Sequence, residues 1–272
     1  MTNRIITSPF YTKNNIPKDG RFSLPNKAFK APELLIPRRK PVGAVKINPG
    51  HVLAPKHFVF ANSPETPIPP VDYAGNVLTT YTGSSITHIG GLLTDNDFLL
   101  VPRGTAENNG YGGFKMNTSI SSADDITVLM DCHLELFTSD RSIVTFDDDA
   151  PWSWLDTSGG TLRVSAYNGA YDTDNAISSP GRYKLGLIWR ADNSYQMIFQ
   201  KKYTKSGTVT RRPFDGTVGM GNGNGDKAGI NWGTSHTLAN YGLFWWGVWN
   251  RSLSQAEVIS VFDDPYQFLD PI

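Results

Sequence analysis

Residues 241–262, YGLFWWGVWNRSLSQAEVISVF, constrain the fold more than any other part of this chain. Residues 241–249 are typical of a β-strand, yet both faces of that strand carry apolar side chains. We therefore expect the strand to be buried on both sides or to lie at the centre of a sheet. One face carries Leu243, Trp245, Gly247 and Trp249, and the other carries Phe244, Trp246 and Val248.

A short helix is predicted directly after this strand. Ser254 is placed as its N-cap, and Glu257 three residues later completes a capping box. Pro265 cannot continue a helix, so the helix ends by about Asp264. A helix of about ten residues is marginal alone and must pack against the strands. Its apolar stripe consists of Val258, Val261 and Phe262.

The clearest alternation of apolar and polar residues runs through residues 126–136. Its polar positions include Thr127, Asp131, His133 and Glu135, and we expect this polar face to be exposed to water. Cys132 lies on the apolar face, and this is the chain's one cysteine. The alternation therefore predicts a buried structural thiol there and excludes a disulfide framework.

Further strands are separated by turns rich in Gly, Asn and Asp. Residues 191–194, Ala-Asp-Asn-Ser, predict a hairpin turn, whereas residues 104–113 and 214–226 are expected to be glycine-rich loops. Many strands and one terminal helix indicate an all-β jelly-roll β-sandwich. The remaining strands are predicted at 58–61, 76–82, 92–101, 142–146, 161–167, 183–189 and 195–203.

The N-terminal segment, residues 1–41, differs from the rest in composition. Six prolines interrupt it, so neither a helix nor a central strand can form there. Residues 1–46 carry ten Lys/Arg and two acids, whereas residues 47–272 carry fifteen Lys/Arg and twenty-three acids. We predict an extended basic arm (1–41) that orders against a partner, preceding one domain (42–272); a disordered tail is the alternative. The predicted partner-binding residues are Phe10, Tyr11, Arg21, Phe22, Phe29, Leu35, Arg38, Arg39 and Lys40.

Two classes of partner are not indicated. Arg38, Arg39 and Lys40 are too few to predict nucleic-acid binding, and neither a recognition helix nor a stacking platform accompanies them. No apolar run approaches the length of a membrane span.

The best enzyme candidate is the trio Asp131, His133 and Glu135, which would share one face of a strand. Glycosidase chemistry needs two carboxylates that face one cleft, and this spacing provides them. An exposed polar sheet face would have the same sequence, so both interpretations stay open.

Two loop features could bind ligands. Asp147, Asp148 and Asp149 form an acidic cluster that suits calcium, although adjacent carboxylates point in different directions and a solvated loop is the alternative. Trp152 and Trp154 would face the same way on an extended segment. Such a pair can stack on sugar rings or be half buried at the edge of a sandwich.

The C-terminal stretch, residues 246–271, resembles the signature of laminin-G-like, concanavalin-A-like jelly-roll domains. In that signature a strand that ends in Trp/Tyr-Asn-Arg leads into a Leu-Ser-x-x-Glu helix start. Asp264-Pro265-Tyr266-x-Phe268 resembles the Asn/Asp-Pro-Trp-x-x-Phe ending of phage-encoded members, with Tyr266 in place of Trp. The matching residues are Trp249, Asn250, Arg251, Leu253, Ser254, Glu257, Asp264, Pro265, Tyr266 and Phe268.

A second match lies near the start of the predicted domain. Ile47-Asn48-x-x-His51-x-Leu53-Ala54 resembles the lead-in of phage-encoded members, with Val52 where proline is usual. Gly90-Gly91-Leu92 resembles the turn into an inner strand. The resemblance covers residues 42–272 and implies a non-enzymatic binding or scaffolding module in a tailed-phage virion.

The resemblance leads to a first functional expectation, which is capsid decoration. The arm would fasten the domain to major capsid or tail proteins on the virion surface in many copies, without a cofactor unless calcium binds. The alternative is a carbohydrate-binding module of a tail fibre that contacts host-surface glycans. A glycan-cleaving enzyme is the second alternative.

Overall fold

The computed structural model describes most of residues 41–272, with gaps. The described residues are 41, 44–60, 71–76, 78–80, 87–89, 98–101, 112–117, 120–121, 123–134, 141–146, 153–158, 161–166, 169–177, 179, 181–209, 217–222 and 241–272. Residues 1–40 lie outside this set, so the arm and the domain division stay predictions. Within the described part, the fold is the expected all-β sandwich with one short helix.

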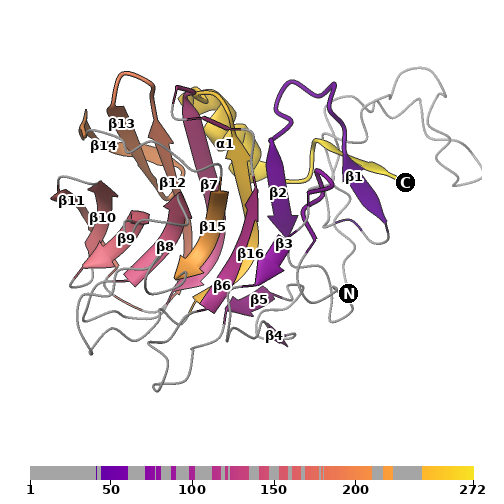
Figure 1. Ribbon diagram of the computed structural model, residues 1–272, viewed down its shortest axis with the longest axis horizontal. Coiled ribbons are helices and arrows are strands. Elements are labelled where there is room, and N and C mark those ends of the chain that lie inside the picture. Colours follow the sequence, from indigo (N-terminus) through magenta and orange to yellow (C-terminus); the bar gives the residue numbers. More distant parts are fainter. Residues whose placement is uncertain are drawn as a thin grey trace, which may run out of the picture. The chain divides into compact units, whose positions relative to one another are not determined.

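Two antiparallel sheets form the sandwich (Figure 1). The seven-stranded sheet has the order β11 (Gly169–Ala176), β10 (Thr161–Ala166), β9 (Ser153–Ser158), β8 (Arg141–Phe146), β15 (Thr217–Asn222), β6 (Gly112–Asn117) and β3 (Leu78–Thr80). The eight-stranded sheet has the order β14 (Lys202–Thr208), β13 (Ser194–Phe199), β12 (Gly181–Trp189), β7 (Ile126–Leu134), β16 (Tyr241–Trp249), β5 (Phe98–Val101) and β4 (Thr87–Ile89), with β2 (His57–Phe60) also paired to β16.

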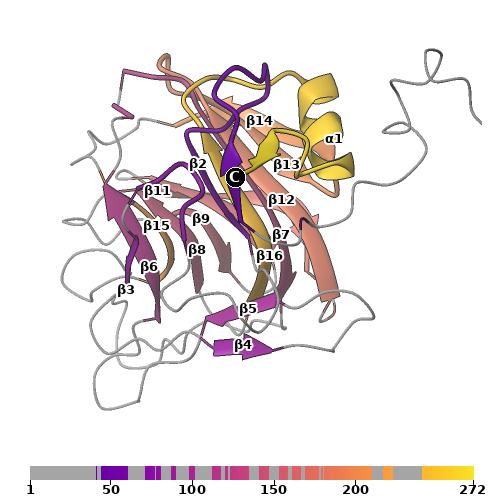
Figure 2. The ribbon, with the colours of Figure 1, turned by 90° about the vertical axis from the view of Figure 1, so that its right-hand side faces the viewer.

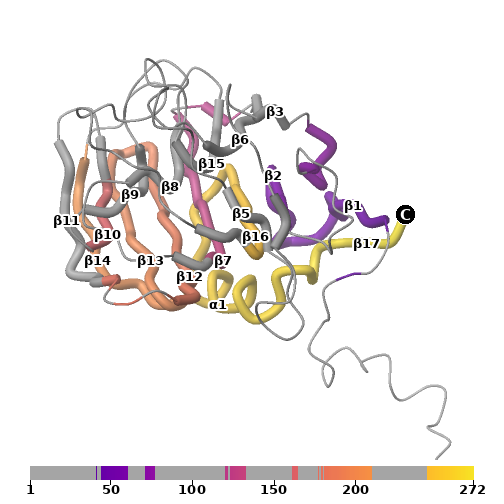
Figure 3. The backbone as a smooth tube through the Cα atoms, turned by 90° about the horizontal axis from the view of Figure 1, so that it is seen from below, coloured from indigo at the N-terminus to yellow at the C-terminus, as the bar shows by residue number. Residues whose placement is uncertain are grey.

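The helix α1 (Gln255–Asp263) forms a third layer on the eight-stranded sheet (Figures 2 and 3). The sheet face toward α1 is called the outer face, and the face toward the other sheet is called the inner face. Ser254 caps α1 through the Glu257 backbone N–H, and the Glu257 side chain accepts from the Ser254 N–H. The predicted capping box is therefore confirmed, as is the buried stripe of Val258, Val261 and Phe262.

Strand β16 is buried on both faces, as its sequence predicts. Trp246 and Val248 lie opposite Met130 and Val128 of β7, so they belong to the inner face. Trp245 and Trp249 lie opposite Asp131 and Thr127 on the outer face. A bulge between Leu243 and Trp245 shifts the register, which places Phe244 with the outer cluster rather than with Trp246.

The expectation that the polar face of β7 is exposed to water is wrong at Thr127 and Asp131. Thr127 and Asp131 are both fully buried, because α1 and the connection before it cover the outer face. Thr127 Oγ1 donates to the Arg251 carbonyl at 2.7 Å and accepts from Leu253 N–H at 3.1 Å. Because the buried Thr127 hydroxyl both donates and accepts a hydrogen bond, it holds the segment just before α1 on the sheet.

The outer cluster is an aromatic core of its own. Trp245 lies 5.3 Å from Phe262 of α1, and Phe58 of β2 meets Phe268 edge to face at 4.8 Å. Each such side chain contributes on the order of 1.5–3 kcal/mol by leaving water. A helix of nine residues is stabilised by this contact and not by its own hydrogen bonds alone.

The two ends of the domain meet in a two-stranded ribbon. Strand β1 (Val45–Ile47) pairs with β17 (Leu269–Pro271), and the Ile272 N–H donates to the Ala44 carbonyl at 3.1 Å. Figure 1 shows the C-terminus beside β1. The segment that joins the predicted arm therefore enters the domain next to its C-terminal residue.

Two predicted elements differ from the structure. Residues 195–203 were expected to be one strand, but a turn at Gln200 and Lys201 divides them between β13 and β14. Residues 217–222, expected to be loop, form β15 between β8 and β6. The predicted hairpin turn is confirmed between β12 and β13, where Asn193 has a φ of 68°.

The other predicted strands are found with shifted ends, and some neighbouring residues lie outside the described set. The loop at 104–113 is largely outside it, although β6 begins at Gly112. Strands β1, β4, β6, β9, β11 and β17 were not predicted. Among the described residues, no helix is long and apolar enough to cross a membrane.

Candidate functional site

Asp131, the first residue of the predicted catalytic trio, lies buried on the outer face of β7. Its Oδ1 accepts from Arg182 Nε at 2.7 Å, and its Oδ2 accepts from Arg182 Nη2 at 2.8 Å and Lys184 Nζ at 2.7 Å. The side chain of Asp131 is 1% exposed, against 38% for Arg182 and 24% for Lys184. The cations therefore shield the carboxylate from any substrate.

Side-chain alternation along β12 and its pairing with β7 position these three side chains. Arg182 and Lys184 are two residues apart on β12, so they project from the same face, and Lys184 pairs directly with Asp131 across the ladder. A carboxylate that is buried without partners would be strongly disfavoured. Two charge-assisted partners, one of them bidentate, make its burial possible.

Aromatic rings lie under the cations. The Arg182 guanidinium lies 3.9 Å from the Phe244 ring centroid, and Lys184 Nζ lies 5.7 Å from that of Phe262. Burial lowers the pKa of Arg182, but the hydrogen bonds to Asp131, the Asp131 charge and smaller charge effects of Tyr266 and Cys132 together raise it overall. Burial, with a smaller contribution from the Asp131 charge, raises the pKa of Tyr266. The Arg182 guanidinium is therefore charged at neutral pH.

Cys132 is the buried structural thiol that its position predicts. Its Sγ donates to the Tyr183 carbonyl at 3.7 Å, and burial raises its pKa well above the ordinary value. A thiol with a raised pKa forms little thiolate, so this cysteine is a poor nucleophile.

The other predicted site residues have no described side chain, so their position relative to Asp131 stays a prediction. His133 and Trp154 lie on β7 and β9, but their side chains are outside the described residues. Among the described residues, no cluster of three or more His, Cys, Asp or Glu could hold a metal ion. The positions outside the described set are Glu135, Asp147, Asp148, Asp149, Trp152 and the arm residues Phe10, Tyr11, Arg21, Phe22, Phe29, Leu35, Arg38, Arg39 and Lys40.

Sequence reasoning missed a buried polar network at the start of the domain. His57 Nδ1 lies 3.0 Å from Asp72 Oδ2, and both side chains are fully buried. Asp72 Oδ1 also accepts from the N–H groups of Phe58 and Ala74 at 2.9 and 3.0 Å. Asp72 thus holds residues 71–76 against β2. A proline-rich stretch separates the partners in sequence, so no local pattern indicates the contact.

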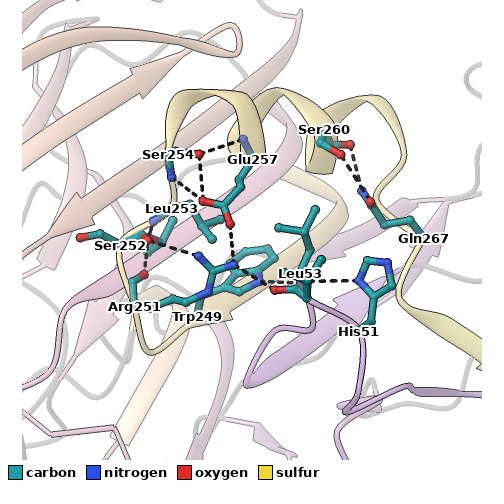
Figure 4. A network of polar contacts seen from close by, with 12 residues as sticks. His51, Leu53, Trp249, Arg251, Ser252, Leu253, Ser254, Glu257, Ser260 and Gln267 are labelled. Atoms are coloured by element: carbon teal, nitrogen blue, oxygen red, sulfur yellow. Dashed lines mark hydrogen bonds and ion pairs between the residues drawn. The ribbon is translucent and has the colours of Figure 1, made fainter.

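Residues of the two sequence signatures contact one another in a single network of polar contacts (Figure 4). Trp249 Nε1 donates to the Leu53 carbonyl at 2.9 Å, and Arg251 Nη2 donates to the Val52 carbonyl at 3.1 Å. Arg251 also pairs with Glu257 Oε1 at 2.9 Å. These residues fasten the lead-in segment to the helix start, so both signatures have a structural role in closing the domain.

Comparisons with known proteins show the fold. No protein-family model matches the chain, and no curated protein matches it significantly. Solved structures do match it, among them a sialidase of Trypanosoma rangeli in complex with sialic acid, with a TM-score of 0.55 and 12% identity. That match covers 78% of this chain and 33% of the sialidase.

Receptor-binding domains of toxins match as well. The binding domain of Paraclostridial Mosquitocidal Protein 1 has a TM-score of 0.54 and 13% identity, covering 78% of this chain and 52% of that one. A structure of botulinum neurotoxin type C, whose cell entry is described as dependent on two ganglioside molecules, has a TM-score of 0.55 and 10% identity over the same shares. The chain spans a third to a half of these proteins, and at such identities the likeness shows a shared β-sandwich fold alone.

Proposed function

We propose that residues 42–272 form a non-enzymatic glycan-binding module. The proposal is supported by the proteins that share the fold, which include a sialidase in complex with sialic acid and a toxin that depends on gangliosides. Because the fold alone does not carry a ligand from one protein to another, the argument for binding depends on the residues of this chain.

The observation that favours binding over cleavage is the state of Asp131. A general acid or nucleophile must reach the scissile bond, and both oxygens of Asp131 are bound to Arg182 and Lys184 inside the protein. The glycan-cleaving alternative at Asp131, His133 and Glu135 therefore loses one of its two carboxylates. A cation site at Asp147, Asp148 and Asp149 stays a prediction.

Trp152 and Trp154 remain the proposed sugar-stacking residues. Trp154 belongs to β9, and Trp152 precedes that strand in the sequence. A glycan array with the intact chain and with Trp152→Ala and Trp154→Ala tests this function. We expect glycan-dependent binding that either substitution weakens. No sugar-dependent signal with the intact chain would reject the proposed function, and binding that both variants retain would reject this location only.

We also propose that the module is displayed on a tailed-phage virion, with capsid decoration as its first role and a tail fibre as the alternative. Two sequence signatures and the basic N-terminal arm support this second proposal, because a basic arm suits the acidic surface of a protein shell. We expect a chain without residues 1–41 to fold but not to associate with particles. Normal incorporation of the truncated chain into particles would contradict the proposal.

A further inference from the structure

Residues 181–209, which form β12, β13 and β14, are basic on an otherwise acidic domain. They carry six Lys/Arg and one acid, Asp192, whereas residues 47–272 as a whole carry fifteen Lys/Arg and twenty-three acids. Three of these cations, Arg182, Lys184 and Lys201, lie near the C-terminal part of α1. Arg182 and Lys184 share Asp131, and Lys201 pairs with Asp263 at the end of the helix.

The ion pairs of this group leave part of Arg182 unused. Arg182 and Lys184 share Asp131, whereas Lys201 pairs with Asp263. Arg182 uses Nε and Nη2 on Asp131, while its Nη1 has no hydrogen-bond partner among the described residues. Because the side chain is 38% exposed, one edge of the guanidinium is available to solvent. That edge is suited to a second carboxylate.

The turn between β13 and β14 supplies an independent observation. Gln200 and Lys201 have φ angles of 49° and 67°, the pattern that a type I′ hairpin turn requires. Asn-Gly is the favoured pair for such a turn, and a non-glycine residue in this conformation costs on the order of 1 kcal/mol. The ion pair of Lys201 with the exposed Asp263 contributes less than about 1 kcal/mol, so it does not offset two strained residues.

The strained turn lies directly beside the cations. The Gln200 N–H donates to the Lys184 carbonyl at 2.8 Å, and the Lys184 N–H donates to Gln200 Oε1 at 3.3 Å. The side-chain amide of Gln200 is exposed and keeps its N–H donors available. Strained backbone conformations are common at binding sites, so the strain in this turn favours a binding role for its side chains.

We propose that Arg182, Lys184, Gln200 and Lys201, here called the basic turn surface, bind the carboxylate of an acidic sugar. This inference depends on the proposed glycan-binding function and names its ligand class. The unused edge of one guanidinium is suited to a single carboxylate group. The neighbouring rings of Phe244 and Phe262 are buried, so this surface recognises charge and hydroxyl groups and does not stack on a neutral sugar ring.

The test is calorimetric titration of the full chain with sialyllactose and with lactose. We expect sialyllactose to bind at least about tenfold more tightly, and its affinity to fall as salt is raised. The double variant Gln200→Asn, Lys201→Gly restores a favoured type I′ turn, so it is expected to fold at least as stably while binding sialyllactose at least about tenfold more weakly. Arg182→Lys keeps the charge but removes the planar edge and is also expected to weaken binding.

Lys202→Gln is the matched control. Lys202 pairs with Phe199 on the opposite face of the hairpin, so its replacement removes a neighbouring charge without touching the basic turn surface. We expect this control to bind sialyllactose as the intact chain does.

Four other results would each contradict a different part of the inference. Equal binding of lactose and sialyllactose would overturn the acidic-sugar assignment and keep the proposed function. Sialyllactose binding that survives both variants would place the site elsewhere. Tighter binding of polyglutamate than of sialyllactose would assign the surface to an acidic protein, and no glycan binding at all would overturn the proposed function with it.

Discussion

The indole Nε1–H of Trp249 donates to the main-chain carbonyl of Leu53 at 2.9 Å, across 196 residues of sequence. Trp249 is the last residue of β16, and Leu53 belongs to the segment that leads into the domain. Both residues are buried, so no water replaces this bond when it is lost. The contact closes the domain by joining its two ends over the outer aromatic cluster.

Replacing Trp249 with Phe is expected to destabilise the domain by about 1–3 kcal/mol, because the variant leaves the buried Leu53 carbonyl without its donor. Urea unfolding followed by far-UV circular dichroism measures this. Val52→Ala is the control, since that side chain is 78% exposed and only its carbonyl is used. Equal stability of the Trp249 variant and the control would show that the bond does not close the domain.

Glu257 makes stability depend on acid pH. Its hydrogen bond from Arg251 is the main reason that its pKa lies below the ordinary 4.5 in the folded protein. A lowered pKa in the folded state stabilises the protein above the pKa of the unfolded state, and this stabilisation is lost as the pH falls through the folded pKa.

We therefore expect Glu257→Gln to be less stable than the intact chain at pH 6 and the difference to shrink below about pH 4.5. Thermal unfolding of both chains from pH 6 to pH 3 measures it. A difference that stays constant over this range would assign the effect to capping geometry and not to charge.

Gly247 is required by packing. A Cβ at this position would lie 2.7 Å from Trp249 Cη2 and 3.2 Å from Phe58 Cδ2, both in a fully buried cluster. Gly247→Ala is expected to lower the free energy of unfolding by about 1–3 kcal/mol through overpacking. Gly181→Ala is the control, because its nearest neighbour would be Tyr183 Cε2 at an ordinary 3.8 Å. Similar losses in both variants would contradict the packing explanation.

The sequence predicts local structure correctly where a few adjacent residues decide it. The capping box of Ser254 and Glu257 and the Asn193 turn were predicted because their signals are short and specific. The turn at Gln200 and Lys201 was missed because neither residue is one that a type I′ turn favours. Its sequence therefore continued a strand pattern that the backbone does not follow.

Two other misses have tertiary causes. Residues 217–222 were expected to be loop because glycines alternate along them, yet Val218 and Met220 also alternate, and pairing with β6 and β8 makes the segment a strand. The alternation in β7 correctly predicted a strand but not the burial of Asp131. A third layer hides that face, and the sequence of β7 carries no sign of it.

Asp131→Asn tests whether this carboxylate is structural. The variant keeps the shape of the side chain but leaves Arg182 and Lys184 facing a neutral amide in a buried position. Because those two cations are 38% and 24% exposed, water compensates part of the lost attraction, and we expect the free energy of unfolding to fall by about 1–3 kcal/mol, which lowers the denaturant midpoint. Arg182→Met is the companion variant, since the exposed part of that side chain tolerates an apolar group and Lys184 still pairs with Asp131; its loss should be smaller. Asp131→Asn with the stability of the intact chain would contradict the structural role of this carboxylate.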